Sequence, residues 1–419
     1  MTFAGWQSLK HFWEANEMAD KKNVPAIRFA GFTDAWEQRK LNNLASKVTE
    51  KNTDLEIQET FTNSAEFGII SQRDFFDHDI SNADNIGGYY VVRDDDFVYN
   101  PRISVTAPVG PVNRNKLCRN GVMSPLYTVF RTHDINTTYL EWFFKSDYWH
   151  PFMYFNGDSG ARSDRFSIKD GVFFEMPIPC PDPNEQRLIG AYLDLLNAFI
   201  TLHQRKYDAL VKVKKAMLEK MFPKGDAEIP EIRFAGFTDA WERRKLGDVF
   251  EEYSEKGHPE LPALTIIQGS GTIRRDESDR SLQYDKASLA NYKVVKNGDF
   301  IVHLRSFEGG LEKATNLGII SPAYHTFHGE GTDSRFYYSY FRSPQFIDQD
   351  LKPHVYGIRD GRSIDIEGMK TINIPWTSFA EQKAIGDFID ILDDLITLHQ
   401  RKLERLKNIK KAMLQKMFV

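Results

Sequence analysis

The residues best suited to chemistry in this chain are arginines and lysines that stand among glycine, asparagine and serine. Four such stretches are NRNKLCRNG at 113–121, NGDSGARSDR at 156–165, GSGTIRR at 269–275 and YGIRDGRS at 356–363. Glycine and asparagine let a backbone approach phosphates, and arginine can donate two hydrogen bonds to a guanine edge. A single loop arginine is usually only solvated, so it is the clustering that favours DNA. The candidate DNA-binding residues are Arg114, Lys116, Arg119, Arg162, Arg165, Arg274, Arg275, Arg305, Tyr356, Arg359 and Arg362.

The short motifs that could indicate an enzyme are all incomplete. SPLY at 124–127 and SPAY at 321–324 approach the [D/N/S]-P-P-Y motif of amino-methyltransferases, but the second proline is absent from both. Glu381-Gln-Lys383 resembles the end of a nuclease E-x-K motif, yet its copy reads Glu185-Gln-Arg187 and lacks a preceding metal-binding aspartate. The sequence has no P-loop, and its eleven histidines show no paired metal spacing. We therefore expect no catalytic residue and no metal ligand in this chain.

A tandem duplication positions these basic loops. VPAIRFAGFTDAWEQRKL at 24–41 returns as IPEIRFAGFTDAWERRKL at 229–246, and the block at 184–222 returns at 380–418. The segments between the repeated blocks hardly match, and the basic residues concentrate in them. Repeated blocks that are preserved, with divergent segments between them, predict one scaffold that presents two different recognition surfaces.

The blocks at 184–222 and 380–418 predict two long helices. Asp182 and Ser378 are expected as N-caps, and Glu185 and Glu381 would complete a capping box. Apolar residues follow a heptad rhythm, and each helix is acidic in its first half and basic in its second, so the pattern predicts an antiparallel coiled coil. A second apolar stripe predicts a further packing partner. The candidate partner-binding residues are Tyr192, Leu195, Phe199, Leu202, Phe388, Ile391, Leu395 and Leu398.

The bulk composition is that of an ordinary soluble protein. The net charge is −5, which taken alone counts against nucleic-acid binding, although the basic residues are unevenly distributed. No apolar run approaches the ~20 residues that a membrane span needs, and the first residues lack the layout of a signal peptide. Two non-equivalent cysteines indicate no disulfide framework. These features predict a cytoplasmic protein with no membrane segment.

The repeated blocks and their order resemble the specificity subunit of a type I restriction–modification system. The resemblance rests on IRFAGFTDAWEQRKL with IRFAGFTDAWERRKL, on MPIPCPDPNEQ with INIPWTSFAEQ, and on the twice-written ITLHQRK, and it covers residues 24–419. CPDPNEQ and WTSFAEQ depart from the Pro-rich P-P-x-x-E-Q that is frequent in the family, but the capping residues remain.

The expected fold class is α+β, with two pseudo-repeated mixed α/β target-recognition domains separated by two long antiparallel coiled-coil helices. The expected parts are an N-terminal extension at 1–23, the first recognition domain at 24–181 and the first spacer helix at 182–222. The second recognition domain then covers 223–377 and the second spacer helix 378–419.

The resemblance implies a function in a complex. Each recognition domain would read one half of a bipartite, asymmetric site in double-stranded DNA, and two modification (methyltransferase) subunits would dock on the helix pair. Restriction (endonuclease and translocase) subunits would complete the assembly. This non-catalytic chain would hold no cofactor, and S-adenosylmethionine, ATP and magnesium would bind to the partner subunits.

Three other functions stay open on the sequence. A stand-alone DNA-binding regulator with two reading heads would have to bind tightly by itself, which the net charge disfavours. A protein-binding adaptor with a coiled-coil arm would show no salt-dependent DNA affinity. The sequence does not separate the recognition subunit of a methyltransferase outside type I systems from the leading hypothesis.

Overall fold

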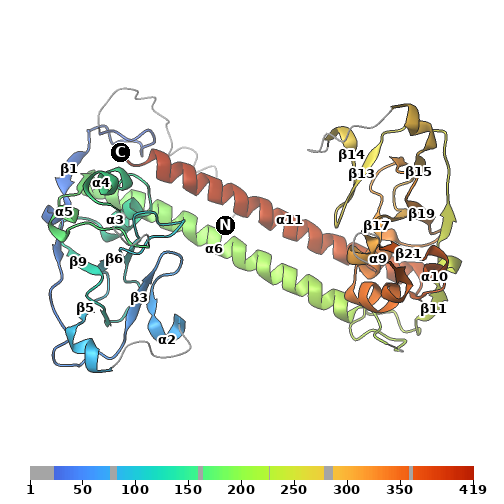
Figure 1. The fold of residues 1–419 in the computed structure, drawn as a ribbon, viewed down its shortest axis with the longest axis horizontal. Coiled ribbons are helices and arrows are strands. Elements are labelled where there is room, and N and C mark those ends of the chain that lie inside the picture. Colours follow the sequence, from blue (N-terminus) through green and yellow to red (C-terminus); the bar gives the residue numbers. More distant parts are fainter. Residues whose placement is uncertain (1–22, 76–82, 159–163, 226, 278–285, 358–361) are drawn as a thin grey trace. The chain divides into compact units, whose positions relative to one another are not determined.

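The computed structural model describes residues 23–75, 83–158, 164–225, 227–277, 286–357 and 362–419. The chain divides into two compact units (Figure 1). Unit 1 comprises residues 1–202 and 402–419, and unit 2 comprises residues 203–401. Helices and short strands alternate in both units, and the predicted α+β class is confirmed. Among the described residues no helix is long and apolar enough to cross a membrane.

Unit 1 is built on a four-stranded antiparallel sheet of order β2-β9-β6-β7, with the pairs β1-β10, β3-β4 and β5-β8 beside it. Its strands are β1 Glu37–Lys40, β2 Ala45–Lys47, β3 Phe61–Ser64, β4 Gly68–Ser71, β5 Tyr90–Val92, β6 Phe97–Tyr99, β7 Val112–Arg114, β8 Gly121–Met123, β9 Thr128–Thr132 and β10 Pro177–Cys180. Its helices are α2 Gln72–Phe75, α3 Thr137–Phe144, α4 His150–Asn156, α5 Asp170–Phe173 and the first part of α6 Pro183–Lys220.

Unit 2 repeats this topology, with the sheet order β12-β19-β16-β17 and the pairs β11-β22, β13-β14, β15-β18 and β20-β21. Its strands are β11 Glu242–Lys245, β12 Glu251–Tyr253, β13 Leu264–Ile267, β14 Gly271–Arg274, β15 Lys293–Val295, β16 Phe300–Val302, β17 Glu312–Lys313, β18 Gly318–Ile320, β19 His325–His328, β20 Val355–Tyr356, β21 Ser363–Ile364 and β22 Asn373–Trp376. Its helices are α7 Leu246–Val249, α8 Ser306–Gly309, α9 Ser334–Phe341, α10 Ile366–Lys370 and the first part of α11 Phe379–Lys416.

An aromatic helix forms the centre of each core. Tyr139 and Phe143 of α3 are almost completely buried, as are Phe336 and Tyr337 of α9. Asn136 caps α3 by accepting a hydrogen bond from the Tyr139 amide, so the first turn of this short helix is satisfied by a side chain.

The long helices begin where the sequence predicts, but their glutamates have a different role. Ser378 Oγ accepts a hydrogen bond from the Glu381 amide at 3.3 Å, as in a capping box. The Glu381 carboxylate, however, accepts two hydrogen bonds from Arg233, at 2.6 and 2.8 Å, and one from the Trp241 indole at 3.0 Å. The reciprocal half of the predicted capping box is therefore wrong, because an arginine from the repeated IRFAGF segment takes the carboxylate.

Unit 1 contains the same set of contacts, in which an arginine and a tryptophan donate hydrogen bonds to the glutamate at the start of the long helix. We call this set the glutamate clamp. Glu185 accepts from Arg28 at 2.7 and 2.8 Å and from the Trp36 indole at 3.1 Å. Both glutamate side chains are fully buried. The repeated IRFAGFTDAW segments thus tie the start of each long helix to its unit.

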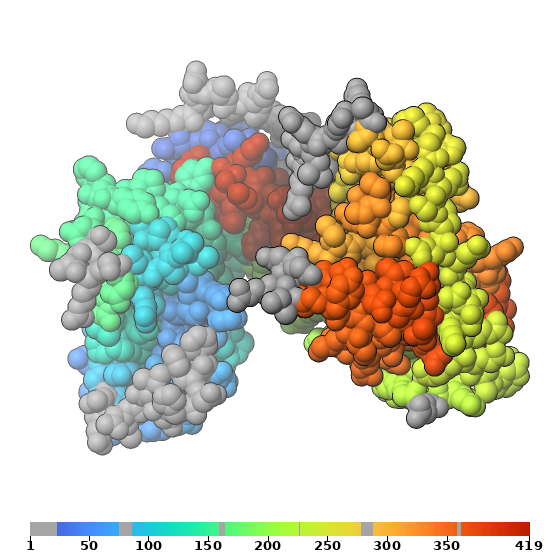
Figure 2. All heavy atoms as spheres, turned by 45° about the vertical axis from the view of Figure 1, so that its right-hand side comes forward, coloured from blue at the N-terminus to red at the C-terminus, as the bar shows by residue number. Residues whose placement is uncertain are grey.

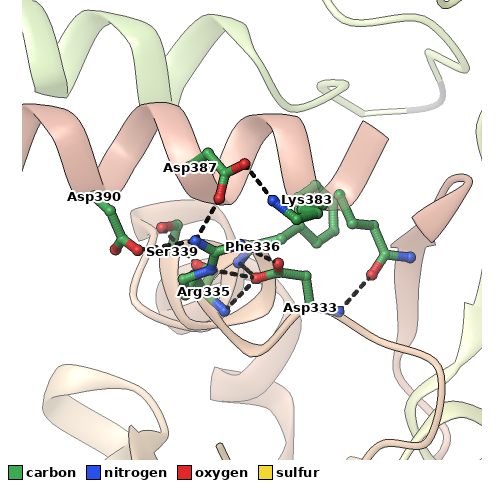
Figure 3. Close-up of polar contacts among 8 residues, drawn as sticks. Asp333, Arg335, Phe336, Ser339, Lys383, Asp387 and Asp390 are labelled. Atoms are coloured by element: carbon green, nitrogen blue, oxygen red, sulfur yellow. Dashed lines mark hydrogen bonds and ion pairs between the residues drawn. The ribbon is translucent and has the colours of Figure 1, made fainter. Parts of the chain in front are cut away.

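The glutamine after each glutamate fixes the aromatic helix. Gln382 Oε1 accepts from the Asp333 amide at 3.0 Å, and Gln186 Oε1 accepts from the Asn136 amide at 2.9 Å. Arg335 adds ion pairs to Asp387 and Asp390 of α11, at 2.6 and 3.0 Å (Figure 3). These contacts hold the start of α9 against α11.

A glycine allows this close approach in both units. A Cβ on Gly386 of α11 would lie 2.8 Å from Asp333 Oδ1, and a Cβ on Gly190 of α6 would lie 3.0 Å from the Thr138 methyl group. Any larger side chain would push the aromatic helix away from the long helix.

The long helices pair antiparallel within each unit, as predicted. In unit 1, Leu193 and Leu196 of α6 share one buried cluster with Leu406 of α11. In unit 2, Lys214 Nζ lies 2.5 Å from Asp393 Oδ1, and the Nδ1 atoms of His203 and His399 are 2.8 Å apart. The two histidines thus meet as polar partners in the helix seam.

Candidate nucleic-acid interface

Three exposed candidate residues of unit 2 are Tyr356 and Arg362 of the β20–β21 hairpin and Arg305 beside α8. Tyr356 pairs with Ser363 across this hairpin, and its side chain is 59% exposed. The Arg362 guanidinium lies over the Phe307 ring of α8, 5.2 Å from its centroid. Arg305, directly before α8, is also exposed. The orange to red segment that includes this hairpin covers a broad part of the face in view (Figure 2).

A small hollow of about 70 Å³ lies beside Arg362, with His303, Leu304, Phe307 and His325 among its lining residues. Leu304 is 69% exposed although it is apolar. Loss of solvation, together with the charges of Arg342 and Arg305, lowers the pKa of His303 to about 4. His303 is therefore neutral at pH 7, and its buried Nε2 has no hydrogen-bond partner among the described residues.

This arrangement suits contact with a base edge. The exposed Arg362 cation and the exposed Leu304 side chain beside one hollow provide two kinds of contact that proteins make in the major groove. His303, in contrast, lies beneath them, and its Nδ1 accepts a hydrogen bond from the Arg305 amide. The sequence predictions missed His303, Leu304 and Phe307. His303 directly follows the strand sequence FIV, at the place where Asn100 follows FVY in the first half of the chain. This difference between the two copies is the sequence signal that could have indicated these residues.

The equivalent loop of unit 1 carries Arg165, which lies six residues before Gly171 as Arg362 lies six before Gly368. The Arg165 main chain pairs with that of Arg102 in an isolated bridge. The Arg165 side chain is half-buried. The structure thus brings Arg165 and Arg102 together in one loop pair. Arg162 and Arg359 lie outside the described residues.

The other candidates of unit 1 have acidic partners within the chain. Arg114 bonds to Glu141 at 2.8 Å and to Asp95 at 3.1 Å, and its side chain is only 9% exposed. Enclosure and pairing disfavour a DNA contact by Arg114, whose DNA-binding role stays a prediction. Lys116 also pairs with Glu141, and Arg119 pairs with Glu59, but both side chains are half exposed.

The remaining candidates of unit 2 lie on another hairpin, β13–β14. Arg274 pairs with Asp276 at 3.0 Å and is half exposed. Arg275 lies over the Tyr292 ring, 5.4 Å from its centroid. The contacts of these two arginines are therefore separate from the group around Arg362.

The second apolar stripe is exposed over most of its length. Its exposed members are Leu195 and Leu202 in unit 1 and Ile391, Leu395 and Leu398 in unit 2. Phe199 is partly buried. Tyr192 and Phe388 are covered by this chain itself, since their rings meet Phe29 and Phe234 of the IRFAGF segments at 6.1 and 5.7 Å.

Comparisons with known proteins agree with the geometry. No family model matches the chain. It is 27% identical over 263 residues to the type I restriction enzyme MjaVIII specificity subunit of Methanocaldococcus jannaschii, over 58% of this chain and 61% of the relative. It is 24% identical to the putative MjaX specificity subunit of the same organism, over 59% of this chain and 60% of the relative. The chain thus spans about three fifths of the length of the curated relatives that it matches.

A solved structure shares the fold. The type I restriction–modification system S subunit from M. genitalium has a TM-score of 0.56 and 13% identity, and the match covers 94% of this chain and 99% of that one. The resemblance to type I specificity subunits that the repeated blocks indicated is confirmed.

Proposed function

We propose that this chain, which is similar in sequence to type I restriction enzyme specificity subunits, is the DNA-specificity subunit of a type I restriction–modification complex. The observation that carries the proposal is that the two units share one architecture but have different side chains in their candidate DNA-binding loops. Both units use the same glutamate clamp and the same sheet order, but Arg362 stands with Tyr356 and Phe307, whereas Arg165 stands with Arg102. Two unlike sets of side chains suit two unlike DNA half-sites.

In this proposal the two units read the two halves of a bipartite double-stranded DNA site. The exposed members of the second apolar stripe receive two modification subunits, and restriction subunits join the complete complex. The chain performs no chemical step. S-adenosylmethionine, ATP and magnesium belong to the partner subunits, because the methyltransferase and nuclease motifs in this sequence are incomplete.

The first test is a pair of arginine substitutions in the assembled complex. Arg362→Ala should weaken binding to targets with one intact half-site, and Arg165→Ala should do so for the other half-site. A base-reading arginine contributes ~1–3 kcal/mol, so each loss should be roughly fivefold to 150-fold and confined to one half. The measurement is DNA affinity against targets in which each half-site is scrambled in turn.

Arg93→Ala is the matched control for these substitutions, because Arg93 is a half-exposed arginine paired with Glu50 and is not among the candidate DNA-binding residues. Binding of wild-type complex that ignores both half-sites would exclude the proposed function. Unchanged half-site preference in both variants would show that these loops do not face DNA.

The docking face has its own test. Leu395→Asp should reduce capture of modification subunits, because a charge would enter an apolar contact and each buried leucine contributes ~1.5–3 kcal/mol. Leu317→Asp is the control, since Leu317 is similarly exposed but lies in a loop instead of on α11. Equal capture of the two variants in a pull-down would exclude this face.

A further inference from the structure

The two units keep the same pair of cations at one place but differ in the groups that neutralise them. The first cation directly follows the aromatic helix and is Lys145 after α3 and Arg342 after α9. The second is on the long helix that packs there, and is Lys410 on α11 in unit 1 and Lys214 on α6 in unit 2. Lys214 and Lys410 occupy the same position in the repeated helix block.

In unit 2 both cations meet a carboxylate. Arg342 forms an ion pair with Glu312 of β17, whose side chain is fully buried. Lys214 forms an ion pair with Asp393 at 2.5 Å. The positive charge at this place is therefore balanced within the chain.

In unit 1 both carboxylates are replaced by asparagine. Lys145 donates to Asn113 Oδ1, and Lys410 donates to Asn197 Oδ1 at 2.7 Å. Asn113 is paired with Val98 in the sheet as Glu312 is paired with Ile301, and Asn197 has the place of Asp393 in the helix repeat. An amide oxygen accepts a hydrogen bond from an ammonium group but does not neutralise its positive charge.

These lysines border a groove of about 670 Å³ in unit 1, between α11 and the turn after α3. Lys407 and Lys411 also line the groove, with Tyr148 and Leu414, and Asp147 is the one acidic side chain among the described residues that line it. In the helix repeat of unit 2, Val211 occupies the position equivalent to Lys407, and Lys215 the position equivalent to Lys411. Lys215 Nζ lies 3.9 Å from Glu219 Oε1. Unit 1 thus gathers four ammonium groups at a place where unit 2 has fewer cations and more carboxylates.

The acidic side chains near the groove neutralise its lysines only in part, and the Lys410 ammonium lies over the Trp142 ring, 4.7 Å from its centroid. Glu141 is held by Arg114, and Asp194 accepts a hydrogen bond from the Trp142 indole. Loss of solvation lowers the pKa of Lys410 and the charge of Lys145 lowers it further, while the charges of Asp194 and Glu141 act in the opposite direction. A bound anion would relieve this repulsion.

We propose that the lysine groove of unit 1 binds the phosphate backbone of DNA beside the half-site that unit 1 reads, without reading bases. This inference rests on the proposed function and adds a sequence-independent anchor on one unit only. Lysine is a flexible point charge that suits a phosphate, whereas base reading favours the fixed fork of arginine.

The interior end of the groove is also connected to the loop pair of unit 1. Asn113 Nδ2 donates to Asn63 Oδ1 at 2.6 Å, Asn100 Nδ2 donates to the Asn63 carbonyl at 2.8 Å, and Asn100 Oδ1 accepts from the Arg102 amide at 2.9 Å. Arg102 pairs with Arg165. These bonds run through the interior of unit 1, since Asn63 and Asn113 are buried, so they brace the groove wall and the loop pair together. The four lysines of the groove are what favour DNA over an acidic protein as the occupant, because a nucleic-acid backbone presents closely spaced phosphates.

The test restores the carboxylate that unit 2 has. Asn197→Asp in the assembled complex should weaken binding of a DNA duplex by roughly fivefold to tenfold at low salt, equally for specific and fully scrambled duplexes. The slope of log affinity against log salt should fall by about 0.9 for each phosphate that the variant no longer neutralises. Lys407→Gln with Lys411→Gln should act in the same way. Asn184→Asp, which makes the same charge change on α6 outside the groove, should leave binding unchanged.

Each other outcome overturns the inference in a recognisable way. Wild-type affinity and salt slope in both groove variants would show that the groove does not meet DNA. Normal DNA binding with reduced capture of modification subunits would assign the groove to an acidic protein surface. A loss confined to one half-site sequence would show base reading instead of a backbone contact. Wild-type complex that binds no duplex would refute the proposed function together with this inference, whereas the first three outcomes leave that function intact.

Discussion

Glu381→Gln is expected to destabilise unit 2 by about 3 kcal/mol, because it removes the buried carboxylate that neutralises the partly buried Arg233 guanidinium. The Glu381 carboxylate accepts from Arg233 and from the Trp241 indole, and its side chain is 1% exposed. Glutamine would keep one acceptor oxygen but would turn an amide N–H toward donors. Removing one partner of a buried pair costs more than the pair contributes, since the remaining charge cannot be solvated.

The measurement is chemical unfolding combined with hydrogen exchange, which resolves the two units. Glu185→Gln should produce the same loss in unit 1, where Arg28 and Trp36 make the matching clamp. Glu367→Gln is the control, because that side chain is 83% exposed. A loss in Glu381→Gln no larger than in Glu367→Gln would show that the clamp does not stabilise the fold.

Local patterns predicted the repeated frame of this chain, while contacts distant in sequence determined what its side chains do. Heptad spacing and helix caps are read within a few residues, so both long helices were predictable. The role of Glu185 was not, because Arg28 is 157 residues away. A capping-box rule considers only the residues near the helix start.

The candidate site shows the same limit. The sequence marked the loop of Arg362 as a DNA-binding candidate because it is basic and contains glycine, and it marked Arg114 for the same reason. Only the fold reveals that Arg114 faces Glu141, 27 residues later, whereas Arg362 stays exposed. The lysine groove depends on Asn113, Lys145 and Lys410 meeting in space, and no spacing rule connects these three positions.

The ends of the long helices provide the second large effect. Phe418, near the end of α11, packs in the core of unit 1 against Tyr139 and Phe143, with ring centroids 5.6 and 6.0 Å apart. Phe222, just after α6, packs in the core of unit 2 against Phe336 and Trp241, at 5.0 and 6.1 Å. Each core is thus completed by the helix that starts in the other unit.

Truncating either phenylalanine is therefore expected to destabilise one unit selectively. Phe418→Ala should destabilise unit 1 and Phe222→Ala unit 2, each by about 3–5 kcal/mol for a buried phenylalanine that leaves a cavity. Faster hydrogen exchange in α3 but not α9 is expected for Phe418→Ala, and the reverse for Phe222→Ala. Leu202→Ala, on the exposed stripe of α6, is the control. Equal acceleration of exchange in both units would contradict this assignment, because it would mean that the cores unfold as one and that neither helix end belongs to a single unit.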